Sequence, residues 1–107
     1  MNFFWKEPDV NLGIKQFVNT PDAILIDVRT RQEFAQGHIP NSRNIPFKDL
    51  KKVRQFIPDL NTPLFVICLN GAQSNHAVFV LRHMGYRYVE DNGGIDRYRG
   101  QISKGAS

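Results

Sequence analysis

The sequence contains one cysteine, no internal repeat and no long hydrophobic run among its 107 residues. A single cysteine excludes an internal disulfide, so nothing points to an oxidising compartment. The N-terminal residues lack the apolar core of a signal peptide, and no stretch is long enough to cross a bilayer. We therefore expect a cytoplasmic protein without a membrane partner.

Charge is in only modest excess. Lysine and arginine number 14 and aspartate and glutamate 10, which gives a formal net charge of +4. The cations look scattered rather than arranged in a stripe, so we expect small anionic substrates and no nucleic-acid partner. The length and the 41% hydrophobic content fit one globular domain over 1–107. Its core is expected at about 9–99, with a flexible tail at 101–107.

Short apolar runs alternate along the chain with segments of helical periodicity. Strands are expected over 23–28, 64–68 and 86–89, with a short strand or connector at 44–46. Three helices are expected where apolar residues recur at helical spacing: after Asp9 (Val10, Ile14, Phe17, Val18), along Phe47, Leu50, Val53, Phe56 and Ile57, and after Ser74 (Ala77, Val78, Leu81).

Turn and cap residues complete this pattern. Thr30-x-x-Glu33 is typical of the capping box that starts a short helix. Residues 91–94 are expected to form a tight turn and 95–98 a short helical turn, while Phe3, Phe4 and Trp5 are expected to pack as an apolar strap. The alternation of strands and helices predicts an α/β fold, a parallel sheet with helices on both faces.

The stretch that carries chemistry surrounds the single cysteine. Cys68 ends the buried run 64–67 and is followed by a short loop and a helical segment, with Ser74 as the expected N-cap. Gly71 lets the loop turn so that several backbone N–H groups point at one spot. A helix N-terminus and such N–H groups stabilise a thiolate, so we favour a functional cysteine over an inert buried one.

Other polar residues are interpreted as structural. Asp27, Arg29 and Glu33 are expected to form a charged network at a strand-to-helix turn rather than an acid–base site. His38 is expected to hold its loop by hydrogen bonds. His76 is a weaker functional candidate, since a protonated histidine is disfavoured near a helix N-terminus, and His83 lies near the helix end. The histidines are too dispersed to predict a metal site.

Three motifs in order resemble the signatures of rhodanese domains. The first is Asp27-Val28-Arg29-x-x-x-Glu33-Phe34-x-x-Gly37-His38-Ile39-Pro40-x-x-x-Asn44-Ile45-Pro46, the second Cys68-x-x-Gly71-x-x-Ser74, and the third Gly85-Tyr86-x-x-Val89-x-x-x-Gly93-Gly94. The resemblance covers about residues 9–99. The loop and the closing motif are most similar to small bacterial rhodaneses of the phage-shock type.

The resemblance implies a single-domain thiosulfate sulfurtransferase with a five-stranded parallel sheet and a persulfide on Cys68. The loop residues Leu69, Asn70, Gly71, Ala72, Gln73 and Ser74 would bind the small anionic donor. Cyanide or a thiol, with a thioredoxin-like protein among the candidates, would accept the sulfur. No metal or organic cofactor is implied.

The loop departs from the family pattern in charge. Many active rhodaneses carry a loop arginine just before the serine, where this sequence has Gln73, and Leu69 follows the cysteine. Weaker binding of anionic donors is expected, unless neighbouring arginines compensate, the candidates being Arg29, Arg31, Arg43, Arg97 and Arg99. A rhodanese-like binding or sulfur-carrier module is therefore the alternative. A cysteine phosphatase or arsenate reductase would need a loop arginine on its oxyanion, and a thioredoxin-like redox role a second cysteine.

Overall fold

The computed structural model describes residues 8–106, which contain one parallel sheet of four strands. The spatial order is β2-β1-β3-β4, and every neighbouring pair is parallel. The strands are β1 (Ile24–Asp27), β2 (Ser42–Asn44), β3 (Leu64–Cys68) and β4 (Val89–Gly94). The expectation of five strands was wrong for the described residues, because the rest of 8–106 forms helices, turns and connecting loops.

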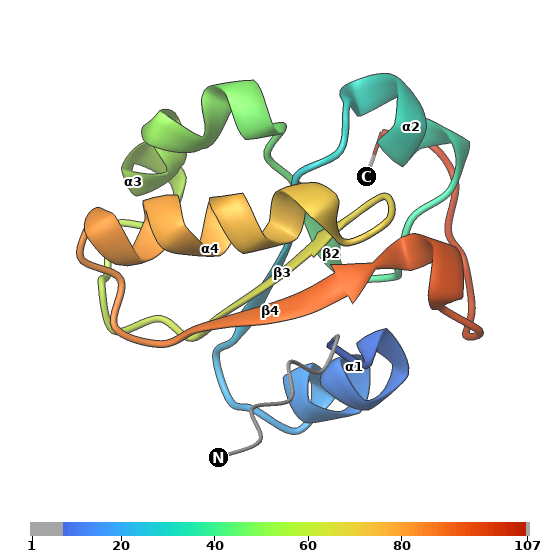
Figure 1. Ribbon diagram of the computed structural model, residues 1–107, viewed down its shortest axis with the longest axis horizontal. Coiled ribbons are helices and arrows are strands. Elements are labelled where there is room, and N and C mark those ends of the chain that lie inside the picture. The colour runs from blue at the N-terminus through green and yellow to red at the C-terminus, as the bar shows by residue number, and fades with distance from the viewer. Residues whose placement is uncertain (1–7, 107) are drawn as a thin grey trace, which may run out of the picture.

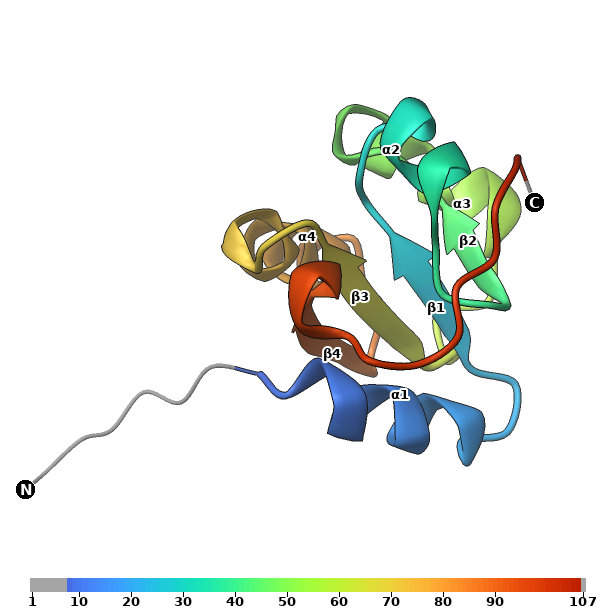
Figure 2. The ribbon, with the colours of Figure 1, turned by 90° about the vertical axis from the view of Figure 1, so that its right-hand side faces the viewer.

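Helices cover both faces of the sheet, as the sequence predicted. The helical elements are α1 (Val10–Val18), α2 (Arg31–Gln36), the 3₁₀ helix η1 (Phe47–Lys52), α3 (Val53–Phe56), α4 (Ala72–His83) and the 3₁₀ helix η2 (Ile95–Arg97). Figures 1 and 2 show α1 against one face, while α3 and α4 lie on the other. None of the helices described is both long enough and apolar enough to cross a membrane.

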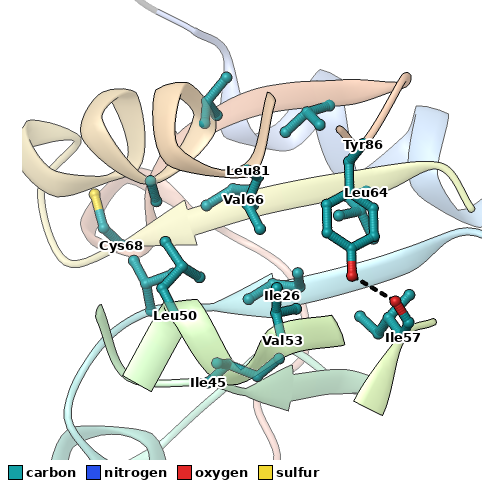
Figure 3. Close-up of a cluster of buried hydrophobic side chains, with 14 residues drawn as sticks. Ile26, Ile45, Leu50, Val53, Ile57, Leu64, Val66, Cys68, Leu81 and Tyr86 are labelled. Atoms are coloured by element: carbon teal, nitrogen blue, oxygen red, sulfur yellow. Dashed lines mark hydrogen bonds between the residues drawn. The ribbon is translucent and has the colours of Figure 1, made fainter. Parts of the chain in front are cut away.

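Two apolar clusters fill the space between the sheet and its helices. The larger cluster lies under α3 and α4, and it includes Ile26, Leu50, Val53, Val66, Cys68 and Leu81 (Figure 3). The smaller lies under α1 and consists of Val10, Leu25, Ile39, Phe65 and Ile67. All five residues of β3 are buried because this strand is covered on both faces. The continuous apolar run before Cys68 has this cause.

Helix α1 begins as predicted and buries most of the predicted face. The Asp9 carboxylate accepts hydrogen bonds from the backbone N–H groups of Asn11 (3.0 Å) and Leu12 (3.3 Å). Phe17 contacts Phe65 edge-on, with ring centroids 5.9 Å apart. Val18 was wrongly placed on the buried face: it is 72% exposed, because it lies at the edge of the stripe and in the last turn.

The segment 47–57 is helical, but one predicted contact is wrong. Leu50, Val53 and Ile57 are buried, whereas Phe56 is 60% exposed. The segment begins as the 3₁₀ helix η1 and continues as α3. Because a 3₁₀ helix turns every three residues and an α-helix every 3.6, the change of period places Ile57 on the core side instead of Phe56.

Strand β4 begins later than the sequence predicted. Residues 86–88 precede it, and residues 91–94, expected as a turn, are strand residues. The register explains this difference: Val66 pairs with Asp91 and Cys68 with Gly94, so β4 carries one extra residue over that interval. Gly93, with φ +76°, accommodates the irregularity. Ile95–Arg97 forms the expected helical turn.

The C-terminal segment, expected as a loose tail, pairs with the loop after α2. Ser103 and His38 form an antiparallel bridge whose two backbone hydrogen bonds are each 2.8 Å. The Gly105 N–H donates to the Ala35 carbonyl at 2.9 Å. These bonds attach the segment to the α2 region. The predicted strap of Phe3, Phe4 and Trp5 lies outside the described residues.

Candidate active site at the end of strand β3

Cys68 is the last residue of β3, at the carboxyl edge of the sheet. The residue is 1% exposed. Its Sγ accepts a hydrogen bond from the Gly71 N–H at 2.9 Å, and the thiol donates to the Gly93 carbonyl at 3.7 Å. Figure 3 shows this sulfur at the start of α4. A backbone donor and a helix N-terminus both favour negative charge on a sulfur.

The loop between β3 and α4 is shorter than predicted. It comprises only residues 69–71, since Ala72 already begins the helix. Gly71 is the N-cap residue, with φ +93°, a left-handed conformation that favours glycine. The Asn70 side chain accepts from the Ala72 N–H at 3.1 Å. Because of this turn, α4 begins at Ala72, two residues before Ser74.

Ser74 is therefore not the N-cap, which corrects the sequence prediction. It lies inside the first turn of α4 and is fully buried. Its hydroxyl donates to the Gly71 carbonyl at 3.3 Å, so it braces the loop from within the helix. Gln73 lies in the same turn and is exposed. The predicted helix face of Ala77, Val78 and Leu81 is buried, as expected.

The end of β4 supports the loop from the neighbouring strand. The Asp96 N–H donates to the Leu69 carbonyl at 3.1 Å. A Cβ at Gly94 would lie 2.7 Å from the Cα and carbonyl carbon of Asn70, so only glycine fits there. Gly94 was expected in a turn over 91–94, and its contact with the loop was not predicted. A glycine inside a strand is itself a signal of close backbone approach.

Two pockets border the loop. The η2 pocket, about 560 Å³, is lined by loop and α4 residues together with Gly93, Gly94, Asp91, Asp96 and Arg97. The η1 pocket, about 530 Å³, is lined by Gln73 and by residues after β1 and in η1, among them Val28, Arg31, Phe47 and Lys48. Gly71 and Gly93, which both contact the Cys68 sulfur, line the η2 pocket.

Of the five arginines that could compensate for the uncharged loop, two line a pocket beside it and three do not. Arg97 lines the η2 pocket and Arg31 the η1 pocket. Arg29 is buried in an ion pair with Asp27 at 2.8 Å. Arg43 and Arg99 are not among the lining residues of either pocket.

The polar residues around the β1–α2 junction satisfy one another. Arg29 Nε and Nη2 donate to the Asp27 carboxylate at 2.8–3.1 Å, and Nη2 also donates to the Gly37 carbonyl at 2.7 Å. Thr30 and Glu33 form the predicted capping box. His38 is buried, stacks on Phe34 with centroids 3.7 Å apart, and its Nδ1 lies 2.8 Å from the Phe34 carbonyl.

The other two histidines lie on the exposed side of α4. The His76 ring is 6.1 Å from that of Phe47, and His83 stacks on Phe79 at 4.8 Å. Within residues 8–106, no three histidine, cysteine or carboxylate side chains are grouped so as to hold a metal ion.

The structure is a parallel α/β sheet in which a single cysteine ends a central strand and lies at the start of the following helix. This arrangement defines a class of α/β proteins whose candidate site is the loop that follows the cysteine. The family described as the rhodanese-like domain matches residues 13–101. The chain belongs to the rhodanese family, which confirms the resemblance drawn from the three motifs.

Curated and solved relatives agree with this assignment. Thiosulfate sulfurtransferase PspE of Escherichia coli is 39% identical over 71 residues, covering 65% of this chain and 68% of that protein. A solved structure titled "rhodanese with anions from E. coli" is 36% identical, has a TM-score of 0.72 and aligns over 78% of this chain and 99% of its own.

The chain is also similar to part of a longer protein. It is 32% identical over 103 residues to the adenylyltransferase and sulfurtransferase uba4 of Ogataea parapolymorpha. The match covers 95% of this chain and 26% of that protein.

Proposed function

We propose that this protein is a sulfurtransferase that carries a sulfane sulfur as a persulfide on Cys68. The observation that carries the proposal is the Gly71 N–H, 2.9 Å from the Cys68 sulfur at the first turn of α4. The thiosulfate sulfurtransferase activity named for PspE supports it. Backbone donors fixed before the reaction stabilise charge on sulfur without reorganising.

The cycle has two displacements. The Cys68 thiolate attacks the outer sulfur of thiosulfate, a new S–S bond forms, and sulfite leaves with the electrons of the broken bond. Cyanide or a thiolate then attacks the outer sulfur of the persulfide, and Cys68 leaves as thiolate. The atoms and electrons balance with no metal or organic cofactor. The η2 pocket is the nearest opening to this buried sulfur, since its lining includes Gly71 and Gly93, which both contact the sulfur.

Intact-protein mass spectrometry tests the cycle directly. The wild type and Cys68→Ala are incubated with thiosulfate and then with cyanide. We expect the wild type alone to gain one sulfur atom and to lose it as thiocyanate. Cys68 is buried in an apolar cluster, so the alanine variant should fold, and its circular dichroism spectrum controls for this. Sulfur transfer at full rate by Cys68→Ala would overturn the persulfide mechanism.

A rhodanese-like binding or sulfur-carrier module is the second candidate. Two observations favour it: Cys68 is 1% exposed, and neither Leu69 nor Gln73 brings charge to the loop. Under this alternative the wild type gains no sulfur from thiosulfate, or gains one sulfur but does not turn over with cyanide. The same mass measurement separates the two functions.

A further inference from the structure

Cations are clustered in residues 48–54, a segment that contributes Lys48 and Asp49 to the lining of the η1 pocket. Residues 48–54 contain four cations and one carboxylate, which gives +3 of the chain's formal net charge of +4. The cations are Lys48, Lys51, Lys52 and Arg54, and all four are exposed. With Arg31, which is also exposed, they form what we call the η1 cationic patch. The expectation of scattered cations was wrong for this run, which is already visible in the sequence; the structure adds that Arg31 lies beside it and that Lys48 lines the η1 pocket.

Most of this charge is not neutralised within the molecule. Asp49 pairs with Arg31 at 3.7 Å and with Lys52 at 3.9 Å. Lys48, Lys51 and Arg54 have no ion pair with any residue of the described range 8–106. An uncompensated patch of one sign attracts a partner of the opposite sign and raises its rate of association.

The patch adjoins the loop that carries Cys68. Arg31 and Lys48 line the η1 pocket together with Gln73 of the first turn of α4. The 3₁₀ helix η1, six residues long, extends the patch by roughly 12 Å at about 2 Å per residue. Figure 1 shows η1 and α3 running alongside α4. Leu69, next to Cys68, is 47% exposed and offers an apolar contact beside the sulfur.

We propose that the η1 cationic patch docks an acidic protein that presents the thiol which accepts sulfur from Cys68. This inference rests on the proposed function and specifies its partner. The acceptor thiolate attacks the outer sulfur of the Cys68 persulfide, a bond forms between those two sulfurs, and Cys68 leaves as thiolate. No further oxidant or reductant is required. The patch holds acidic residues on either side of the acceptor cysteine.

The same patch fits a nucleic acid less well. Asp49 lies among its cations and would face the phosphates of an extended polyanion. Binding of single strands also relies on several exposed aromatic side chains for base stacking. Residues 47–57 offer one, Phe56, which is 60% exposed, whereas Phe47 is half-buried and packs against the core. An acidic protein can place separate carboxylates against the individual cations and avoid Asp49.

Two cysteine peptides of equal length test the proposal, one with glutamates flanking the cysteine and one with lysines. With thiosulfate as donor, we expect kcat/KM for the glutamate peptide to be about tenfold higher at low salt. The preference should fall to within about twofold at about 0.5 M salt, because exposed charges are then screened. In the variant Lys48→Glu/Lys51→Glu the preference should be lost, because the patch then holds three cations and three carboxylates. The control Lys15→Glu/Arg87→Glu, with the same change of charge at exposed positions outside the patch, should keep it.

Peptides with serine in place of cysteine separate docking from chemistry. Their binding to the wild type and to both double variants, followed by fluorescence anisotropy, should show the same preferences without any sulfur transfer. If thiosulfate leaves no persulfide on Cys68 but the binding preference is seen, the proposed function fails and the docking surface stands. Equal binding of the two peptides, an unchanged preference in Lys48→Glu/Lys51→Glu, or tighter binding of a single-stranded RNA of equal charge would overturn the inference.

Discussion

The β1–α2 and β3–α4 junctions lie at the same edge of the sheet, but their hydrogen-bond donors have different acceptors. At the β1–α2 junction, Asp27 accepts hydrogen bonds from the backbone and side chain of Arg29, both residues being buried. Thr30 and Glu33 satisfy the first turn of α2 with a capping box. Each charged or capping group therefore has its partner inside the junction.

At the β3–α4 junction no side chain caps the helix at the N-cap residue, Gly71. The Gly71 N–H instead donates to the Cys68 sulfur. Two junctions of the same topology thus differ in what their donors serve: at β1–α2 they stabilise the fold, whereas at β3–α4 one backbone donor, the Gly71 N–H, faces the Cys68 sulfur. The following predictions test this distinction.

The largest effect on stability is expected from Asp27→Ala. It leaves the buried Arg29 guanidinium without its carboxylate, and breaking a buried ion pair in this way costs about 3–5 kcal/mol. Urea denaturation measures the loss. The double variant Asp27→Ala/Arg29→Met should recover part of it, because no buried charge then remains unpaired. Wild-type stability in Asp27→Ala would show that the junction is not a structural network.

Gly94→Ala should damage the second junction. Its new Cβ would lie 2.7 Å from the Asn70 backbone, and overpacking of this kind costs about 1–3 kcal/mol. Because Asn70 belongs to the cysteine loop, we expect the rate of persulfide formation to fall by at least about tenfold. Gly37→Ala is the matched control, since its Cβ would meet only the Ile102 side chain, at 3.1 Å. Equal rates in both variants would contradict the role of Gly94.

Gln73→Arg should increase the difference between the two junctions, because it adds an exposed positive charge in the first turn of α4, next to the cysteine loop. Hydrogen bonds to charged groups contribute about 1.5–3 kcal/mol, so kcat/KM with thiosulfate should rise by about one to two decades at about 1.4 kcal/mol per decade. Gln73→Met keeps the length without charge and controls for shape. An unchanged or lower kcat/KM in the arginine variant would mean that Arg31, Arg97 or steric fit already governs donor binding.

The smallest effect is expected from Thr30→Ala, which removes the cap of α2. Loss of such an N-cap costs about 1 kcal/mol, measured as a shift of the urea midpoint. The rate of sulfur transfer per folded molecule should change little, because Thr30 lines the η1 pocket but its side chain makes its hydrogen bonds within the capping box. A large loss of transfer rate in this folded variant would show that the two junctions are functionally coupled.

Much of the fold could be predicted because local patterns agree with tertiary packing. The buried run before Cys68 is a strand, and Asp9 and the Thr30-x-x-Glu33 box cap their helices. Predictions failed where packing or register competes with periodicity. Phe56 is exposed because the helix changes period, and residues 91–94 form a strand because β4 carries an extra residue.

For the candidate site too, features set by local sequence could be predicted and features set by tertiary contacts could not. The position of Cys68 at a strand end and the family could be inferred from the order of motifs alone. Ser74 was mistaken for the N-cap because a serine before an apolar helical face is a common start signal, whereas the left-handed Gly71 begins the helix earlier. The supporting glycine at 94 could not be assigned to the loop, because the contact joins residues far apart in sequence.

The sequence by itself determined the α/β class, the N-caps of α1 and α2 and the one cysteine placed between a buried strand and a helix, because these depend on neighbouring residues and on hydrophobic periodicity. Only the tertiary structure decided which N–H faces the sulfur, which strand end supports the loop, and which cations gather beside it. Those features depend on strand register and on contacts across the sheet edge, where residues distant in the chain are brought within a few ångströms of one another.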